Sequence, residues 1–200
     1  MSPTVAGFDL AKFPAQDAYG FLMSAVVPRP IALVTTSGLA GITNAAPFSS
    51  FIALSPKPPM VGVIVGGWEG RRKDTLANVE RTGEFVANAV TEAMAAAVQG
   101  AAAELPPDES ELSTVRLETA PSTVVAPLRI AVSPIAFECV LDHIVPLGDA
   151  PDRLLVGRVV WVHIQDALWR NGRIQGGAWK PLGRVGGGAF CRLAEAFRLA

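Results

Sequence analysis

The feature that most restricts the fold of this chain is a succession of strand-type segments with no helix placed regularly between them. Parallel sheets need a crossover connection, usually a helix, between successive strands. The order therefore predicts a mainly β fold with helical excursions, an antiparallel β-barrel rather than a doubly wound sheet. The strand-type runs are 31–36, 60–66, 84–90, 136–146 and 153–165, the last two joined by a turn at 148–151 that predicts a hairpin.

Helical patterns are confined to a few places. Asp74–Arg81 has apolar residues at helix spacing, with Asp74 or Thr75 as the expected N-cap and Gly83 as the expected C-terminal stop. Further helical segments are expected at 18–23, at 91–103 and from Ser110. We expect one domain over residues 1–200, in which residues 1–20 form an N-terminal arm.

The segment Gly41–Pro59 departs from an ordinary buried strand. It predicts a second strand over 41–54, bent or broken at Pro47, and a loop or sheet edge over 55–59, because prolines cannot donate to a ladder. Its centre, NAAPFSSF at 44–51, places small residues, an amide and two hydroxyls where large apolar side chains are usual. Small residues on a strand let another molecule approach the backbone. A β-bulge followed by a serine-rich turn is the alternative that the segment alone leaves open.

A basic segment, Arg71-Arg72-Lys73, stands directly before the helix expected at Asp74. A helix N-terminus offers unpaired N–H groups and a partial positive charge, so Lys73 and the Thr75 hydroxyl add up to a site for a single phosphate. A solvated cationic loop before a capped helix is the open alternative. The glycine spacing excludes a Walker loop, and Gly186–Gly188 lacks a dinucleotide fingerprint, although it could form a flexible flap.

Composition and motifs exclude several other functions. The net charge of −1 argues against nucleic acid as a partner and gives no reason to expect a membrane surface. No apolar stretch is long enough to span a bilayer, there is no signal-peptide pattern, and Cys139 and Cys191 stand alone, so we expect a cytoplasmic protein. His143 and His163 lack a second ligand at metal spacing, so no metal site is predicted. No nucleophile has an acid–base partner in sequence, and we name no catalytic residue.

Taken together, these segments resemble the flavin reductase-like family, whose members bind FMN on a split β-barrel. The resemblance runs from about Phe21 to Phe190. It rests on the order and spacing of PRPIALVTT at 28–36, NAAPFSSF at 44–51, KDT at 73–75, GEFVAN at 83–88 and PLGRVGG at 181–187.

The resemblance implies where FMN would lie. The edge of the isoalloxazine ring would rest against the strands at 31–36 and 41–51, where it would meet Thr35, Thr36, Asn44, Ala45 and Ala46. The ribityl chain would follow Ser49, Ser50 and Phe51 toward a phosphate held by Lys73 and Thr75, with help from Arg71 or Arg72. Arg29 would either reach the phosphate or shape the pocket entrance. Trp68 would either close over the ligand or be a surface aromatic residue.

The resemblance also implies the chemistry. NADH or NADPH would pass a hydride to the flavin, while the protein supplies position, desolvation and hydrogen bonds to the ring edge. The implied partners are a second copy of the chain in a homodimer, the flavin and nicotinamide molecules, and a separate flavin-dependent monooxygenase that takes up the reduced flavin. Two alternatives stay open: an FMN-holding electron-transfer protein with a protein or metal-ion partner and no nicotinamide turnover, and a binding module that has lost its flavin.

Overall fold

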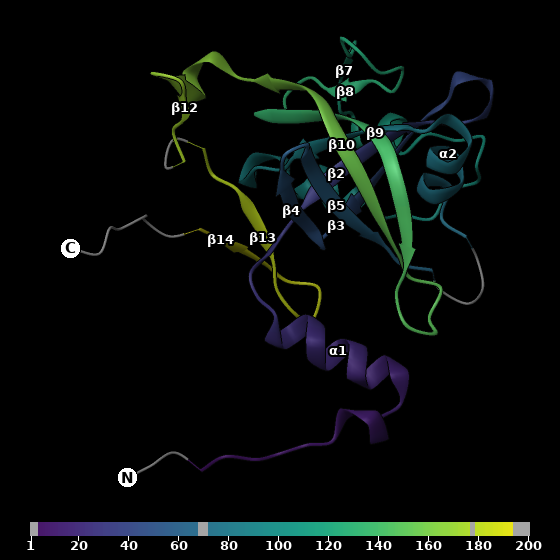
Figure 1. The fold of residues 1–200 in the computed structure, drawn as a ribbon, viewed down its shortest axis with the longest axis vertical. Coiled ribbons are helices and arrows are strands. Elements are labelled where there is room, and N and C mark those ends of the chain that lie inside the picture. Colours follow the sequence, from purple (N-terminus) through teal and green to yellow (C-terminus); the bar gives the residue numbers. More distant parts are fainter. Residues whose placement is uncertain (1–3, 68–71, 177–178, 194–200) are drawn as a thin grey trace.

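The fold is built around one curved antiparallel sheet (Figure 1). The structure is a computed structural model that describes residues 4–67, 72–176 and 179–193. The seven strands lie in the order β3-β2-β6-β9-β10-β5-β4, and each hydrogen-bonded pair is antiparallel. Their bounds are β2 (Ala32–Ser37), β3 (Thr43–Phe48), β4 (Phe51–Pro56), β5 (Pro59–Val65), β6 (Glu84–Ala89), β9 (Ile135–Pro146) and β10 (Arg153–Ile164). The predicted mainly β barrel with helical excursions is confirmed.

The strand expected over 41–54 is broken at a different place from the one predicted. Pro47 lies inside β3, and the break falls at Ser49-Ser50, between β3 and β4. The reason is that β3 is an edge strand. The Ala45 N–H points away from β2 to a side chain, and the nitrogen of Pro47, two residues further on, faces the same way. The N–H that proline lacks therefore removes no bond from the β2–β3 ladder.

The expected loop at 55–59 is a tight hairpin. Pro56 at the end of β4 pairs with Pro59 at the start of β5, so that only Lys57 and Pro58 form the turn. β4 is the other edge strand of the sheet, which agrees with the predicted edge. The hairpin predicted for the last third is also confirmed, because β9 and β10 pair from Ile135 with Ile164 to Pro146 with Arg153.

The helices are α1 (Ala15–Ala25), α2 (Asp74–Thr82), α3 (Ala95–Gly100) and α4 (Glu111–Val115), with short 3₁₀ turns η1 (Leu10–Lys12), η2 (Leu39–Gly41), η3 (Glu92–Met94) and η4 (Asp166–Leu168). Three of the helices, α2, α3 and α4, pack against strands of the sheet, and α1 lies apart from it. Gly83 ends α2 with a left-handed φ of 72°, as predicted. The expected N-cap is wrong: Asp74 and Thr75 lie inside α2, and Lys73 is the cap residue. Ser110 caps α4 by accepting a hydrogen bond from the Leu112 N–H, as its position predicts.

Short strands complete the architecture. β1 (Arg29–Pro30), β13 (Leu182–Arg184) and β14 (Phe190–Arg192) form a small sheet, β7 (Thr119–Ala120) pairs with β8 (Arg129–Ile130), and β11 (Trp169–Arg170) pairs with β12 (Arg173–Ile174). Asn171-Gly172, a residue pair typical of tight turns, joins β11 to β12, with both residues at positive φ. The strands β7 and β8 have two residues each, which is too short for a periodic signal.

Two large apolar clusters and two smaller ones form the core of the described residues. The first fills the barrel and includes the fully buried side chains of Val63, Phe85, Cys139 and Leu155. Gly157 of β10 belongs to it, because a Cβ at this position would lie 2.4 Å from the Phe85 ring. The second cluster lies between the sheet and the helices α3 and α4. Successive residues of β2 belong to alternate clusters, so both faces of this strand are covered.

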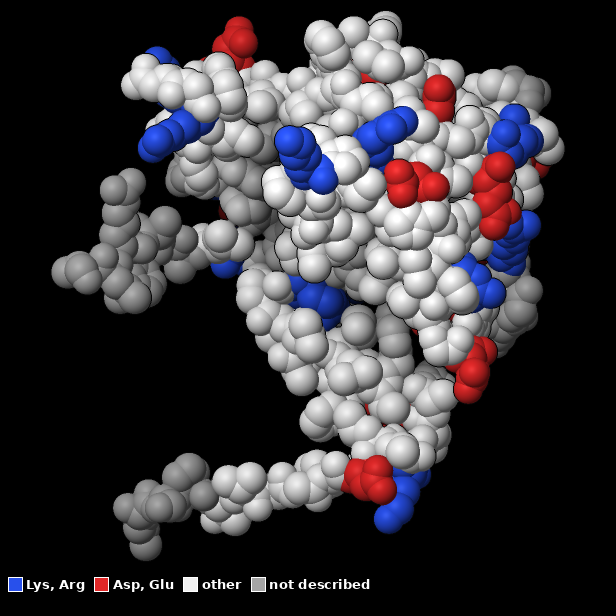
Figure 2. Space-filling model, in the orientation of Figure 1, with Lys and Arg blue, Asp and Glu red and all other residues white. Residues whose placement is uncertain are grey.

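The N-terminal arm lies outside the barrel. α1 has no buried residue, and it stands apart from the seven-stranded sheet on the side where β13 and β14 lie (Figure 1). On the face drawn in Figure 2, acidic and basic side chains are scattered rather than gathered by sign, and the arm is largely uncharged. Within the described residues, no helix has the length and apolar character needed to cross a membrane.

Candidate functional site

A cavity of about 470 Å³ opens beside the free edge of β3. Its walls are β3, the N-terminus of α2, the segment that follows α3 and the first residue of α4. The lining residues are Asn44, Ala46, Pro47, Phe48, Arg72, Lys73, Asp74, Thr75, 101–105 and Glu111. The volume falls in the range of roughly 300–1,000 Å³ that is usual for sites of small molecules.

The centre of the cavity wall is Asn44, whose amide joins three elements. Its Oδ1 accepts hydrogen bonds from Thr75 Oγ1 of α2 at 3.0 Å and from Thr36 Oγ1 of β2 at 3.3 Å. Its Nδ2 donates to Glu111 Oε1 of α4 at 2.9 Å. Asn78 of α2 extends the chain by donating to Thr36 Oγ1 at 3.1 Å. This network fixes the start of α2 against β2 and β3.

Glu111 is the residue of the site that the sequence did not single out. Its side chain is only 6% exposed, and its Oε2 accepts from the Ala45 N–H at 2.9 Å. Burial raises the pKa of this carboxyl, and the charge of Asp74 adds to the rise; the hydrogen bonds from the Ala45 N–H, from its own backbone N–H and from Asn44 oppose it only in part. The available signal was the helix start at Ser110, which places an acidic residue in the first turn but does not show what it faces.

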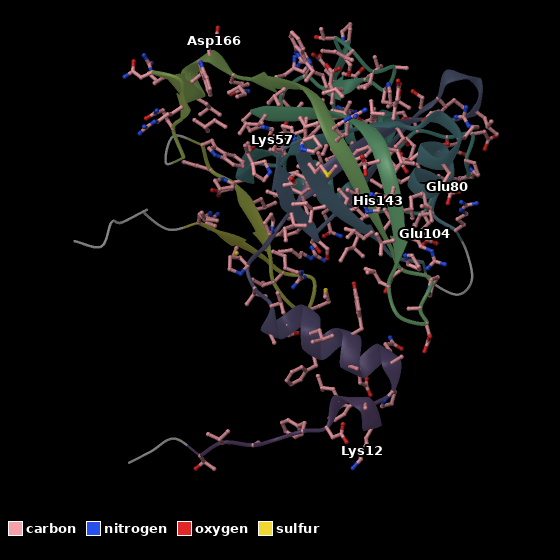
Figure 3. The ribbon with its side chains drawn as sticks, viewed as in Figure 1. Lys12, Lys57, Glu80, Glu104, His143 and Asp166 are labelled. Carbon is pink, nitrogen blue, oxygen red and sulfur yellow. The ribbon has the colours of Figure 1, made fainter. Side chains whose placement is uncertain are left out.

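The cationic end of the cavity is the N-terminus of α2. Among the side chains described, none caps this terminus, so the first N–H groups of α2 face the space that Arg72, Lys73 and Thr75 line. Each cation has an acidic neighbour: Lys73 Nζ lies 3.0 Å from Glu104 Oε1, and Arg72 pairs with Glu80. Figure 3 shows Glu80 and Glu104 on the side of the barrel where α2 lies. The arrangement can hold one anionic group.

The residues expected to meet a ring are brought together at β2 and β3. Asn44 and Ala46 line the cavity. Thr35, Thr36 and Ala45 are buried behind it. The Thr35 hydroxyl is used elsewhere, because it donates to the carbonyl oxygen of Leu128 at 2.5 Å.

Ser49, Ser50 and Phe51, which were expected to follow the ribityl chain, come directly after β3 in the sequence. Ser49 lines a smaller cavity of about 130 Å³ that shares Pro47 and Ala102 with the larger one and also includes Arg184. The Ser50 carbonyl oxygen accepts from the Ile64 N–H at 3.1 Å. Phe51 packs against the barrel core, with its ring 6.1 Å from that of Phe137.

Arg29 lies away from the large cavity. Its side chain is 7% exposed, and its guanidinium donates to the carbonyl oxygens of Met23 and Val26 at the end of α1. In this position it anchors α1 to the small sheet of β1, β13 and β14. Trp68 and Arg71, also named from the sequence, lie outside the described residues.

Both histidines lie in strands and pair with carboxylates. His143 of β9 is exposed and its Nδ1 lies 2.7 Å from Asp142 Oδ2, whereas His163 Nε2 of β10 lies 2.5 Å from Glu138 Oε1. Over 4–67, 72–176 and 179–193, no cluster of three or more His, Cys, Asp or Glu side chains could hold a metal ion. The two cysteines are free thiols, and burial raises the pKa of Cys139.

Comparison with known proteins gives one consistent family. The sequence pattern described as flavin reductase like domain matches residues 23–178. A relative from Halalkalibacterium halodurans, which has no described function, is 39% identical and aligns over 92% of this chain and 90% of its own.

Two solved structures share the whole fold. Nitrilotriacetate monooxygenase component B from Bacillus cereus is 35% identical, with a TM-score of 0.94 over 99% of this chain and 100% of that one. The 2-nitrobenzoate 2-nitroreductase NbaA of Pseudomonas fluorescens is 30% identical, with a TM-score of 0.89 over 98% of this chain and 95% of that one. A flavin reductase with split barrel domain from Shewanella frigidimarina has the same fold, with a TM-score of 0.83 over 96% of this chain and 95% of that one at 21% identity, which confirms the expected split barrel.

Proposed function

We propose that this chain, which belongs to the flavin reductase-like family, binds FMN in the cavity beside β3. The bound FMN would receive a hydride from NADH or NADPH. The observation that carries the proposal is the N-terminus of α2, which no described side chain caps and which lies at one end of a cavity of about 470 Å³. FMN has one phosphate at the end of a long molecule, and it matches a cavity with a single cationic end.

The phosphate would lie against the first turn of α2. Lys73 would supply charge, and the N–H groups that follow it would supply hydrogen bonds. The Thr75 hydroxyl already donates to Asn44 in this structure, so its backbone N–H is the more available donor. A phosphate would compete with Glu104 for the ammonium group of Lys73.

The ring would lie along β3, where the side chains are small. Ala46 leaves room for a flat molecule at the strand, and the Asn44 amide lies beside that space. Bound FMN supplies the hydride-accepting centre. The chain's own residues orient the ring and exclude water on one side, which is why the site needs no acid–base pair.

Reduced flavin would then leave for a separate enzyme. The likeness to nitrilotriacetate monooxygenase component B supports a flavin-dependent monooxygenase as the partner that consumes it. NAD(P)H as the reductant, together with the free thiols of Cys139 and Cys191, fits a cytoplasmic location.

The likeness to a 2-nitrobenzoate 2-nitroreductase favours a second candidate. In it, the reduced flavin stays bound and a nitroaromatic compound takes its electrons in the same cavity. Loss of 2-nitrobenzoate in the presence of NADH or NADPH, with FMN retained through gel filtration, would support this candidate over flavin release.

We also propose a homodimer. The N-terminal arm and α1 expose apolar side chains that the described part of the chain leaves uncovered, which is typical of a surface that another subunit covers. These side chains are Val5, Phe8, Phe13, Tyr19, Phe21, Leu22, Val26 and Val27. Light scattering during gel filtration should give twice the chain mass of 20.9 kDa, and a monomer would contradict the proposal.

The test of the main proposal is the visible absorption spectrum of the purified protein, before and after addition of NADH or NADPH, with and without added FMN. Flavin bands that a nicotinamide bleaches support the reductase. Bands that stay oxidised contradict it and favour an electron carrier with another donor. A protein that is colourless and binds no added FMN would contradict flavin binding altogether.

A further inference from the structure

Glu111 is a buried carboxylate at the cavity that the proposed hydride transfer does not use. We propose that Glu111 is a positioning residue whose charge sets the direction of the hydrogen-bond network around Asn44, and that it takes up a proton when FMN binds. The inference rests on the proposed function, because it assumes that FMN is the ligand. It adds a residue and a regulation to that site.

The network in the structure runs in one direction and ends on Glu111. Asn78 donates to Thr36, Thr36 and Thr75 donate to the Oδ1 of Asn44, and the Nδ2 of Asn44 donates to Glu111. An ionised carboxylate only accepts hydrogen bonds, so it holds the amide of Asn44 with its nitrogen toward α4. In this state the Thr75 O–H is turned toward Asn44.

A neutral Glu111 favours the opposite direction. One oxygen can still accept from the Ala45 N–H, but the protonated oxygen needs an acceptor, and Asn44 offers one only if its amide turns over. Nδ2 of Asn44 then donates to the hydroxyl oxygens of Thr75 and Thr36. The hydrogen of the Thr75 hydroxyl becomes free to point into the cavity, which Thr75 lines.

The charged groups around Glu111 favour its protonation when an anion binds in the cavity. Asp74 of α2 and Glu104 line the same cavity, and Lys73 and Arg72, its two cations, are each paired with an acid. Exposed Glu109 lies on the loop before α4. FMN would bring negative charge and displace water from the carboxylate, and both effects disfavour an ionised Glu111.

The consequence is a pH-dependent affinity with a defined sign. If binding takes up a proton at Glu111, the dissociation constant for FMN rises as pH rises, by up to about tenfold per pH unit. Ionisation of the FMN phosphate has the opposite sign at a cationic site, because the dianion binds such a site more strongly. The two effects can therefore be separated.

The test is the dissociation constant for FMN, measured by quenching of flavin fluorescence from pH 5 to pH 8.5 in the wild type and in Glu111→Gln. Glutamine keeps an acceptor for Ala45 and a permanent N–H donor for Asn44, so it imitates the protonated residue. We expect similar affinities at pH 5 and binding about tenfold tighter in Glu111→Gln at pH 8.5, for a difference of one pKa unit. Glu109→Gln removes the same charge two residues away and should follow the wild type.

Two further measurements keep the inference testable. Titration calorimetry in buffers of different ionisation enthalpy should show that the wild type takes up more protons with FMN than Glu111→Gln does, because ionisation of the FMN phosphate contributes equally to both. In Thr75→Val the advantage of Glu111→Gln at high pH should shrink. Parallel pH profiles for wild type and Glu111→Gln, or equal proton uptake by the two proteins, would overturn the inference alone. A wild type that binds neither FMN nor riboflavin at any pH would overturn the proposed function, and this inference with it.

Discussion

Two glutamates are buried in the described part of this protein, one beside the edge strand β3 and one on β9 in the middle of the sheet, and their pKa values move in opposite directions. Glu111 faces the cavity beside β3, and burial raises its pKa. Glu138 of β9 is fully buried, and burial alone would raise its pKa as well. It is lowered instead, because Glu138 accepts from the N–H groups of Thr123, Val124 and Val125 and bonds to His163.

The number of donors accounts for the difference. Glu138 bonds to three backbone N–H groups at 2.6–3.0 Å and to an imidazole at 2.5 Å, whereas Glu111 has the Ala45 N–H, its own backbone N–H and the amide of Asn44. The four partners of Glu138, one of them an imidazole, stabilise its ionised form more than burial disfavours it, and the three neutral donors of Glu111 do not. Glu138 thus holds the segment between β7 and β8 against the sheet, while the pKa of Glu111 stays raised. A buried carboxylate with too few hydrogen-bond donors is therefore a better indicator of a functional site than one whose donors fully stabilise its charge.

The largest expected effect is at Glu138. Glu138→Gln would put an amide nitrogen against donors and leave backbone N–H groups unsatisfied, so we expect the free energy of unfolding to fall by about 3 kcal/mol. Urea unfolding followed by circular dichroism measures it. The comparison predicts a much smaller loss for Glu111→Gln. A larger loss for Glu111→Gln than for Glu138→Gln would reverse the assignment of the two roles.

Lys73→Ala tests the cavity end. Removing the ammonium group at the start of α2 should weaken FMN binding by roughly 1–3 kcal/mol, the range for a charge-assisted hydrogen bond. Riboflavin, which has no phosphate, should bind equally well to wild type and variant. Lys57→Ala is the matched control, because Lys57 lies in the β4–β5 hairpin, away from α2 (Figure 3). Unchanged FMN affinity in Lys73→Ala would remove Lys73 from the phosphate site.

The pH dependence of stability should separate the two glutamates by sign. The pKa of Glu138 is lowered on folding, so its contribution is present above about pH 4.5 and is lost as pH falls through the lower value. The pKa of Glu111 is raised, so its contribution is present below about pH 4.5 and is lost as pH rises through the higher value. Each is worth about 1.4 kcal/mol per pKa unit. Unfolding curves from pH 3 to pH 8 should show the first dependence removed in Glu138→Gln and the second in Glu111→Gln.

Much of the fold was predictable from local patterns. Apolar and alternating runs predicted β2, β5, β6, β9 and β10, and Gly83 predicted the end of α2, because these signals depend only on neighbours in sequence. The position of the strand break was wrong for a non-local reason. Whether Pro47 interrupts a ladder depends on β3 being an edge strand, and the order of strands in the sheet is set by tertiary packing.

The candidate site was predictable where local sequence was informative and was missed where it depends on contacts between distant segments. Asn44, Lys73 and Thr75 stood out by type and position, and the structure brings all three to one cavity. Glu111 did not stand out, because its partners Asn44 and Ala45 are 67 and 66 residues away in the sequence. The local sequence Ser110-Glu111 predicts the start of a helix but not which residues that helix contacts. The position of Lys73 as the N-cap of α2 was missed as well. Sequence-based prediction of an N-cap looks for a side chain that accepts a hydrogen bond from the helix, and Lys73 makes no such bond.

The smallest effect is expected at His143, where the comparison predicts almost nothing. His143 is exposed, and among the described residues its side chain bonds to Asp142 alone, so His143→Ala should leave flavin binding intact and change the free energy of unfolding by less than about 0.5 kcal/mol. His163→Ala should cost about 1 kcal/mol, because it removes one of four partners from Glu138. Chemical unfolding and FMN titration of both variants measure this. A large loss of flavin affinity in His143→Ala would place a functional group on β9 and contradict the assignment of flavin binding to the cavity beside β3.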